Sequence, residues 1–228
     1  RRFFAYFHPI LKDEPLIFVE VAFTKGIGKS IQQLIKPKTD ENLNYDTATF
    51  YSINNCQDGL MRVTLGNFLI KRVVFEIQQE NQKIKNFGTL SPLPGFADWF
   101  FSLNNTKLQD ILKKYDISKL EFLKSPQLKV GDPKMIEEEV ALKKLVCHYL
   151  INEKINNKPL NPVSRFHLGN GASIHDVIIN GNTSDYGYSE SFGIMVNYGY
   201  QLDKLEHIHE DFITKGKISY SDKIKKYV

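Results

Sequence analysis

The stretch TATFYSINNCQDGLMRVTLGNFLIKRVVFEIQQE, residues 47–80, decides the local architecture of this chain. Its first part, Thr47–Ile53, is rich in β-branched and aromatic residues, which is typical of a strand. Apolar residues between Asn67 and Glu80 are interleaved with charged ones at the spacing of an amphipathic helix. The stretch therefore predicts a strand, a loop and a helix in that order.

The loop inside this unit is a candidate phosphate-binding loop. Gly59 and Gly66 bracket it, and Arg62, Lys71 and Arg72 add positive charge. A helix N-terminus carries free N–H donors and a partial positive charge, and glycine lets a phosphate approach the backbone. Many strand-to-helix turns contain glycine for purely structural reasons, so both interpretations stay open at this point.

The segments before this unit predict a hairpin and a short helix. Residues 1–23 contain two strand-like runs around a turn at His8–Pro9. The KGIGKS segment that follows ends in Ser30, which can cap a short helix. A phosphate-binding P-loop would need a glycine where Phe23 stands, so we interpret KGIGKS as a turn into a capped helix.

The segments after the unit predict further mixed structure. FGTLSPL, residues 87–93, reads as a strand, and ADWFFSLN, residues 97–104, as the start of a helix. Residues 106–139 form charged helical pieces that we expect to be peripheral. The tail contains strand-like HLGNGASIHDVIIN at 167–180 and the aromatic stretch VNYGY at 196–200.

Composition describes an ordinary globular domain. The 228 residues carry a net charge of +4, far below the charge density of a nucleic-acid binder, and no apolar run reaches the length of a membrane span. Cys56 and Cys147 are too few for a disulfide framework, so we expect two small buried hydrophobes. The first residue is Arg1, which we interpret as the start of a processed or truncated piece.

Four separated motifs carry a family resemblance. In chain order they are VTLGNFLIKRVV (63–74), LSPLPGF (90–96), NPVSRFHLGNGA (161–172) and GIMVNYGY (193–200). Together they resemble the catalytic domain of the malonyl-CoA decarboxylase family. The resemblance covers residues 1–228, except for a variable helical excursion at about 104–140 that matches poorly.

The resemblance implies a fold and a ligand. The fold is an α/β, acetyltransferase-like (GNAT-like) mixed sheet, flanked by helices and splayed to admit CoA. The implied CoA-binding loop comprises Met61, Arg62, Val63, Thr64, Leu65, Gly66 and Asn67. Malonyl-CoA is then the substrate, with no separate cofactor or metal and with neither nucleic acid nor membrane as a partner. The helical N-terminal domain of the family is absent from these residues.

Further expectations come from the family alone. A full-length protein of this kind is expected to be a homo-oligomer. Its location is mitochondrial, peroxisomal or cytoplasmic by resemblance, with mitochondria favoured.

The resemblance also assigns residues to the chemistry. Ser91 and His167 correspond to the catalytic pair, and Asn161 and Tyr200 to further substrate contacts, with Asn197 and Tyr198 as supports for Tyr200. Malonyl-CoA carries its own electron sink in the thioester carbonyl, so a hydroxyl and an imidazole at the malonyl group suit the reaction. Pro92, Pro94 and Gly95 are expected to hold Ser91 on a rigid turn.

Two other interpretations of these residues are weaker. A hydrolase nucleophile elbow needs G-x-S-x-G, and Thr89 and Leu93 occupy the glycine positions around Ser91. His207 and His209 suggest a metal, but a transition-metal site needs three or four ligands, so a charged helix face is preferred.

The chain departs from the family at one position. The family places a glutamate in V-E-L-G, and this chain has Thr64 there. A threonine hydroxyl can hydrogen-bond but cannot act as a carboxylate base. Three function classes therefore remain: a malonyl-CoA decarboxylase, a catalytically weakened CoA-binding relative, and a CoA-dependent acyltransferase.

Overall fold

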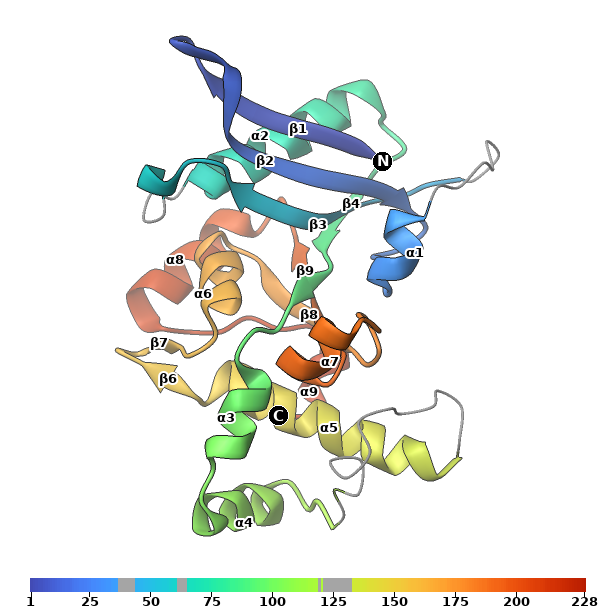
Figure 1. Ribbon diagram of the computed structural model, residues 1–228, viewed down its shortest axis with the longest axis vertical. Helices are drawn as coiled ribbons and strands as arrows, with labels where there is room; N and C mark the ends of the chain where they lie inside the picture. Colours follow the sequence, from blue (N-terminus) through green and yellow to red (C-terminus); the bar gives the residue numbers. More distant parts are fainter. Residues whose placement is uncertain (37–43, 61–64, 119, 121–132) are drawn as a thin grey trace.

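The molecule is built on a mixed β-sheet (Figure 1). The structure is a computed structural model, and it describes residues 1–36, 44–60, 65–118, 120 and 133–228. Within these residues the strand order is β1-β2-β3-β4-β9-β5, and β8 pairs with the other edge of β9. The strands of this sheet are β1 (Arg2–His8), β2 (Leu11–Thr24), β3 (Thr47–Asn55), β4 (Asn86–Thr89), β5 (Ser91–Pro92), β8 (Ser173–Ile178) and β9 (Met195–Tyr200). The short strands β6 (Lys154–Ile155) and β7 (Lys158–Pro159) form a separate pair.

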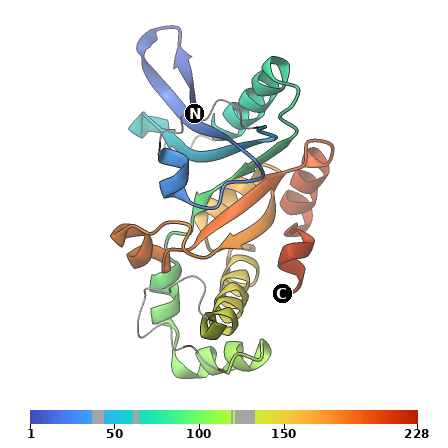
Figure 2. The same cartoon turned by 90° about the vertical axis from the view of Figure 1, so that its right-hand side faces the viewer.

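Helices cover both faces of this sheet. Their bounds are α1 (Ile31–Ile35), α2 (Leu65–Glu80), α3 (Phe96–Ser102), α4 (Asn105–Lys114), α5 (Pro133–Ile151), α6 (Pro162–Gly169), α7 (Asp185–Ser191), α8 (Leu205–Lys215) and α9 (Asp222–Lys225), with a 3₁₀ turn at Asp58–Leu60. In Figure 2, α2 and α8 lie on one side of the sheet and α1 and α7 on the other. The predicted α/β fold of a mixed sheet flanked by helices is confirmed.

The sheet opens where its parallel pair ends. Strands β3 and β4 run parallel from Thr47 opposite Asn86 to Phe50 opposite Thr89. Beyond this point β3 stays paired with β2 as far as Asn55, whereas the chain of β4 continues into β5 and pairs with β9. Figure 1 shows the two halves of the sheet diverging here. The implied splay is therefore present, and it begins next to Ser91.

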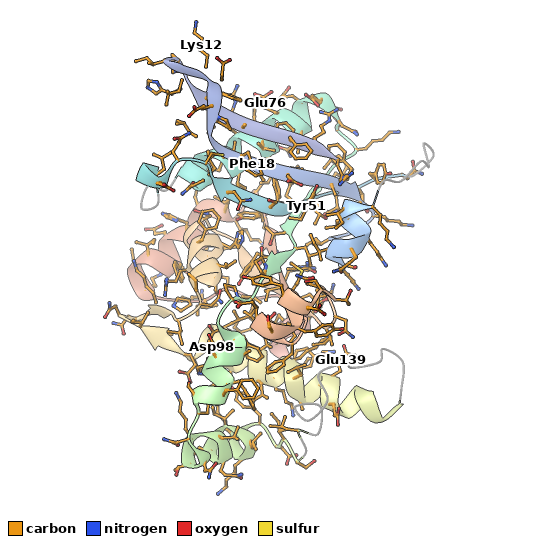
Figure 3. The ribbon with its side chains drawn as sticks, viewed as in Figure 1. Lys12, Phe18, Tyr51, Glu76, Asp98 and Glu139 are labelled. Carbon is orange, nitrogen blue, oxygen red and sulfur yellow. The ribbon has the colours of Figure 1, made fainter. Side chains whose placement is uncertain are left out.

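The elements predicted around the opening are confirmed. The first 24 residues form the β1–β2 hairpin, with Lys12 near its projecting tip (Figure 3). Ser30 caps α1 by accepting a hydrogen bond from the backbone N–H of Gln33. The strand–loop–helix unit appears as β3, the 3₁₀ turn and α2.

Three predictions need correction. Residues 106–139 are not wholly peripheral, because Ile111, Tyr115 and Ile117 within them are buried in the hydrophobic core. His167 lies in a helix, because α6 occupies the first part of the segment interpreted as strand-like. Cys147 is buried as expected, but Cys56 is exposed.

Candidate active site

Ser91 is the first residue of the two-residue strand β5, and a rigid turn follows this strand. Gly95 adopts a left-handed conformation with φ of 73°, which favours glycine, and ends the turn at the start of α3. The carbonyl of Pro94 accepts hydrogen bonds from Asn161 Nδ2 at 2.9 Å and from the Tyr149 hydroxyl at 3.4 Å. The predicted bracing of Ser91 is thus present, and two elements outside the turn reinforce it.

His167 lies on α6 and contacts Ser91 from this helix. The sequence itself indicates where the helix starts. Asn161 caps the helix by accepting from the backbone N–H of Ser164 at 2.8 Å, and Pro162 occupies its first turn. The Nε2 atom of His167 lies 2.9 Å from Ser91 Oγ. The predicted Ser91–His167 pair is therefore brought together across 76 residues of sequence.

The other nitrogen of His167 contacts Tyr200. Its Nδ1 atom lies 2.9 Å from the Tyr200 hydroxyl. The ring of Tyr198 stacks on the imidazole with centroids 4.6 Å apart. The Tyr200 hydroxyl therefore meets the side of His167 that faces away from Ser91, and its contact with substrate stays a prediction.

Thr89 is a further member of the site that the sequence did not single out. Ser91 donates its hydroxyl proton to Thr89 Oγ1 at 2.8 Å, and the backbone N–H of Tyr198 donates to the same oxygen at 3.2 Å. Thr89 precedes Ser91 by two positions in an extended chain, a spacing that places both side chains on one face. That spacing is the signal by which Thr89 could have been found.

These hydrogen bonds favour one tautomer of His167. A serine hydroxyl has a single proton, and Ser91 directs it to Thr89. The Ser91 oxygen is then left to accept from Nε2–H of His167, so Nδ1 must accept from the Tyr200 hydroxyl. The three side chains thus form one directed chain from Tyr200 through His167 to Ser91.

Burial determines the charge of these three hydrogen-bonded side chains. Ser91, His167 and Tyr200 are each exposed by 5% or less. Burial in a poorly polar environment lowers the pKa of His167 to about 3 and raises the pKa of Tyr200 above its ordinary range. At neutral pH the imidazole and the phenol are therefore both uncharged.

Asn197 and Asn161 connect the backbone segments around the site through hydrogen bonds. Asn197 Nδ2 donates to the carbonyls of Thr89 at 2.8 Å and Gly28 at 3.0 Å, and its predicted support of Tyr200 stays a prediction. Asn161 is fully buried and uses its amide nitrogen and oxygen inside the fold. It ties α6 to the Ser91 turn, and its contact with substrate stays a prediction.

The predicted CoA loop is described in part. Met61, Arg62, Val63 and Thr64 lie outside the described residues, whereas Leu65, Gly66 and Asn67 form the first turn of α2. The backbone N–H groups of a first helical turn have no partner within the helix. Arg72 on the same helix pairs with Glu76 at 2.7 Å.

Two further sequence hypotheses can be compared with the described residues. None of the described histidines, cysteines and acidic residues gather in threes to hold a metal ion, and His207 and His209 lie on the surface of α8. No helix in the described part of the chain is long and apolar enough to cross a bilayer.

The opened sheet and the buried pair define a class of protein. The structure resembles a solved GNAT-like decarboxylase, GphF in complex with isobutyryl-CoA, with a TM-score of 0.51 at 14% identity, over 89% of this chain and 78% of that one. The fold is therefore GNAT-like. Within this class, the chain belongs to the malonyl-CoA decarboxylase C-terminal domain family, whose model it matches over residues 1–228.

Relatives and solved structures agree with this assignment. The mitochondrial malonyl-CoA decarboxylases of Anser anser anser and Mus musculus are 34% and 32% identical, over 100% and 98% of the chain. The chain spans about half the length of these curated relatives, since it covers 50% of each. Crystal structures of malonyl-CoA decarboxylases from Rhodopseudomonas palustris and Agrobacterium vitis match with TM-scores of 0.83 and 0.84, at 38% and 37% identity. Those matches cover 99% and 100% of this chain and 56% of each solved chain.

Proposed function

We propose that this chain decarboxylates malonyl-CoA to acetyl-CoA and carbon dioxide, a carboxy-lyase reaction. The observation that carries the proposal is the buried bond of 2.9 Å between Ser91 Oγ and His167 Nε2, located where the sheet opens. Family membership and the names of the relatives support the choice of substrate.

The reaction requires only a few contributions from the protein. The thioester carbonyl of malonyl-CoA accepts the electrons released when the carboxylate leaves, so an enolate forms without another electron sink. The protein must stabilise the enolate oxygen and return a proton to carbon. Ser91 supplies a hydroxyl for these tasks, and His167 supplies a second proton donor directly behind it.

The opened sheet offers a path for the CoA portion. Strand β3 and the β5 turn separate beyond Phe50, and α2 begins beyond the far end of β3. We place the pantetheine in this opening and the pyrophosphate on the first turn of α2, at Leu65, Gly66 and Asn67, where free N–H donors favour an anion. Ser91 then lies at the thioester end of the opening.

Assembly and location follow the relatives. We propose that the full-length protein is a homo-oligomer, as the family resemblance implies. The curated relatives carry the word mitochondrial in their names, and mitochondria are the location we propose.

Product analysis of purified protein tests the proposed reaction. After dialysis against a chelator, the protein is expected to convert malonyl-CoA to acetyl-CoA, because the substrate supplies its own electron sink. Chromatography of the CoA esters measures the products. Free CoA and malonate would indicate hydrolysis, and activity that required zinc or magnesium would contradict the mechanism.

A catalytically weakened CoA-binding relative is the second candidate, and Thr64 is the observation that favours it. If a carboxylate at this position assists the Ser91–His167 pair, Thr64→Glu is expected to raise turnover about tenfold, since a general acid or base contributes about 10²–10⁴-fold. The affinity for CoA should change little, because the malonyl end is affected. Steady-state kinetics and calorimetric titration with CoA measure both effects.

The outcomes separate the two candidates. A wild-type protein with an ordinary enzyme rate, together with a neutral or harmful Thr64→Glu substitution, would mean that threonine substitutes for glutamate and would end the weakened-relative hypothesis. If neither form were active while both bound CoA, the decarboxylase proposal would be wrong.

A further inference from the structure

A cleft lies on the sheet face that turns away from His167. Tyr198 and Tyr200 of β9 both contact His167. Side chains alternate along a strand, so Asn197 and Gly199 face the other way, where they border a cleft of about 790 Å³. Tyr200 also borders the cleft, but its hydroxyl contacts His167. The volume of the cleft is that of a small-molecule site.

The cleft is separate from the opening proposed for CoA. That opening begins beyond Phe50 and Thr89, at the carboxyl ends of the parallel strands β3 and β4. The cleft instead borders Thr47 and Asn86, the first residues of the same two strands. The two places are three residues of extended strand apart, which is about 10 Å. A ligand in this cleft is therefore distinct from the CoA phosphates that we place on α2.

The border of the cleft is strongly basic. Four lysines contribute to it from three segments of the chain: Lys25, Lys29, Lys85 and Lys223. Two carboxylates, Asp176 and Asp203, also border the cleft, so positive charge is in excess. Lys223 lies 3.8 Å from Asp176. Within the part of the chain that the structure describes, the other three lysines form no ion pair.

The loop between β2 and α1 forms one wall of the cleft and carries two of these lysines. The backbone N–H of Gly26 donates to the Asp46 carboxylate at 2.8 Å, and Asn197 Nδ2 donates to the carbonyl of Gly28 at 3.0 Å. The lysines of this loop are thus carried on a fixed backbone. Because the N–H groups of Gly26 and Gly28 already have partners, the lysine side chains are the donors that an anion would meet.

Helix α9 contributes Lys223 from another wall. Ser221, the residue before this helix, donates its backbone N–H to the carbonyl of Ile174 at 2.9 Å and its hydroxyl to the carbonyl of His175 at 2.6 Å. These two bonds join the start of α9 to β8. Lys223 therefore also stands on a fixed part of the backbone.

His175 marks the place where the positive charges converge. Its Nε2 atom lies 3.4 Å from Lys223 Nζ. Burial lowers the pKa of this imidazole, and Lys223 and Lys29 lower it further against the opposing effect of Asp176. Lysines from two different elements thus act on one ring, which is uncharged at neutral pH. An anion between the two ammonium groups would be attracted by both.

We propose that this cleft binds a small anion that carries at least two linked phosphate groups. Lysine ammonium groups bind phosphate as point charges, without the fork by which arginine matches a carboxylate. The lysines stand on separate segments, so two linked phosphates span them better than one. Thr47, Ser173 and Asn197 are buried polar residues that border the cleft, which favours a hydrophilic ligand over an apolar one. The site does not depend on the proposed decarboxylation.

Calorimetric titration with inorganic pyrophosphate tests the site. Wild-type protein is expected to bind it at least about tenfold more tightly than Lys29→Gln/Lys223→Gln, in which two charge-assisted contacts are lost. Lys113→Gln/Lys154→Gln is the matched control, because it removes the same charge from exposed lysines outside the cleft, and its affinity should stay within about twofold.

Three results of this titration would overturn the proposal. The first is a wild-type protein that does not bind pyrophosphate. The second is undiminished binding in Lys29→Gln/Lys223→Gln. The third is an equal loss in both double variants, which would indicate general attraction by net charge.

Two further titrations define the ligand and separate it from CoA. Inorganic phosphate is expected to bind at least about tenfold more weakly than pyrophosphate, because one group cannot reach lysines on both walls. Equal affinities would contradict a ligand with two phosphates. The affinity of Lys29→Gln/Lys223→Gln for CoA should stay within about twofold of wild type. A parallel loss of CoA and pyrophosphate affinity would assign these lysines to the CoA site and overturn the proposal.

Histidine NMR locates the bound anion. With pyrophosphate present, the pKa of His175 is expected to rise by at least about 0.5, because an adjacent anion favours the imidazolium form. His207, exposed on α8 and outside the cleft, is the reference whose resonances should not respond to pyrophosphate. An unchanged pKa of His175 under saturating pyrophosphate would place the anion elsewhere and overturn the proposal. None of these measurements needs turnover, so an inactive protein would contradict only the proposed function.

Discussion

His167→Asn is expected to lower the turnover of malonyl-CoA at least about 100-fold, because removal of one well-placed donor from a transition state costs about 3 kcal/mol. Asparagine cannot contact Ser91 and Tyr200 at the same time, so the directed chain from Tyr200 to Ser91 is broken. Affinity for CoA should be retained, since the change lies at the malonyl end. Steady-state kinetics and calorimetry measure the two quantities.

A substitution of Ser91, the hydrogen-bond partner of His167, is expected to have a similar effect. Ser91→Ala should lower turnover by a similar factor, and the double variant should be little worse than either single one, because residues that act as a unit are not additive. His148→Asn is the matched control: His148 is also buried, but it contacts Tyr115 and Glu153 instead of the site. Near-normal turnover in either site variant would remove that residue from the mechanism.

Gly171→Ala is expected to destabilise the fold by about 3 kcal/mol or more. Gly171 has φ of +79°, a conformation that side chains rarely adopt, and an added Cβ would lie 2.2 Å from the carbonyl oxygen of Leu205. That oxygen belongs to the backbone of α8, so relief requires the packing between α6 and α8 to shift. For a domain of this size the melting temperature should fall by about 6–12 °C.

A glycine two positions away provides the control. An added Cβ at Gly169 would meet Phe212 at 3.9 Å, which is ordinary contact distance, and Gly169 lies within α6. Gly169→Ala should therefore leave the melting temperature nearly unchanged. Thermal unfolding of the two variants decides the matter, and equal stability would mean that the close contact between Gly171 and Leu205 is relieved at little cost.

Local signals predicted much of the fold. The Ser30 cap and the β1–β2 hairpin depend on residues that are neighbours in sequence, and both were found. The turn after Ser91 was also predicted, because Pro92, Pro94 and Gly95 restrict the backbone by themselves. In each case the residues that make the structure lie within a few positions of one another.

Helix α6 was missed for an identifiable reason. The glycines at 169 and 171 and the apolar run after them favoured a strand over the segment that contains His167. The correct signal was Asn161–Pro162, a capping residue followed by proline, which is typical of a helix start. Asn161 and Pro162 outweigh the two glycines here, and His167 therefore lies on a helix.

The arrangement around His167 could not come from local signals. The contacts of His167 with Ser91 and Tyr200 span 76 and 33 residues and depend on β9 pairing beside β5. The family resemblance indicated Ser91, His167 and Tyr200, but the order in which they bond required the structure.

The most direct test of the central claim follows the reaction by ¹³C NMR with malonyl-CoA labelled in its free carboxylate. The account predicts that wild-type protein releases the label as carbon dioxide and bicarbonate while acetyl-CoA accumulates in equal amount, and that Ser91→Ala does so at least about 100-fold more slowly. Label that stays in malonyl-CoA, or appears in malonate, while the protein binds CoA would contradict the account.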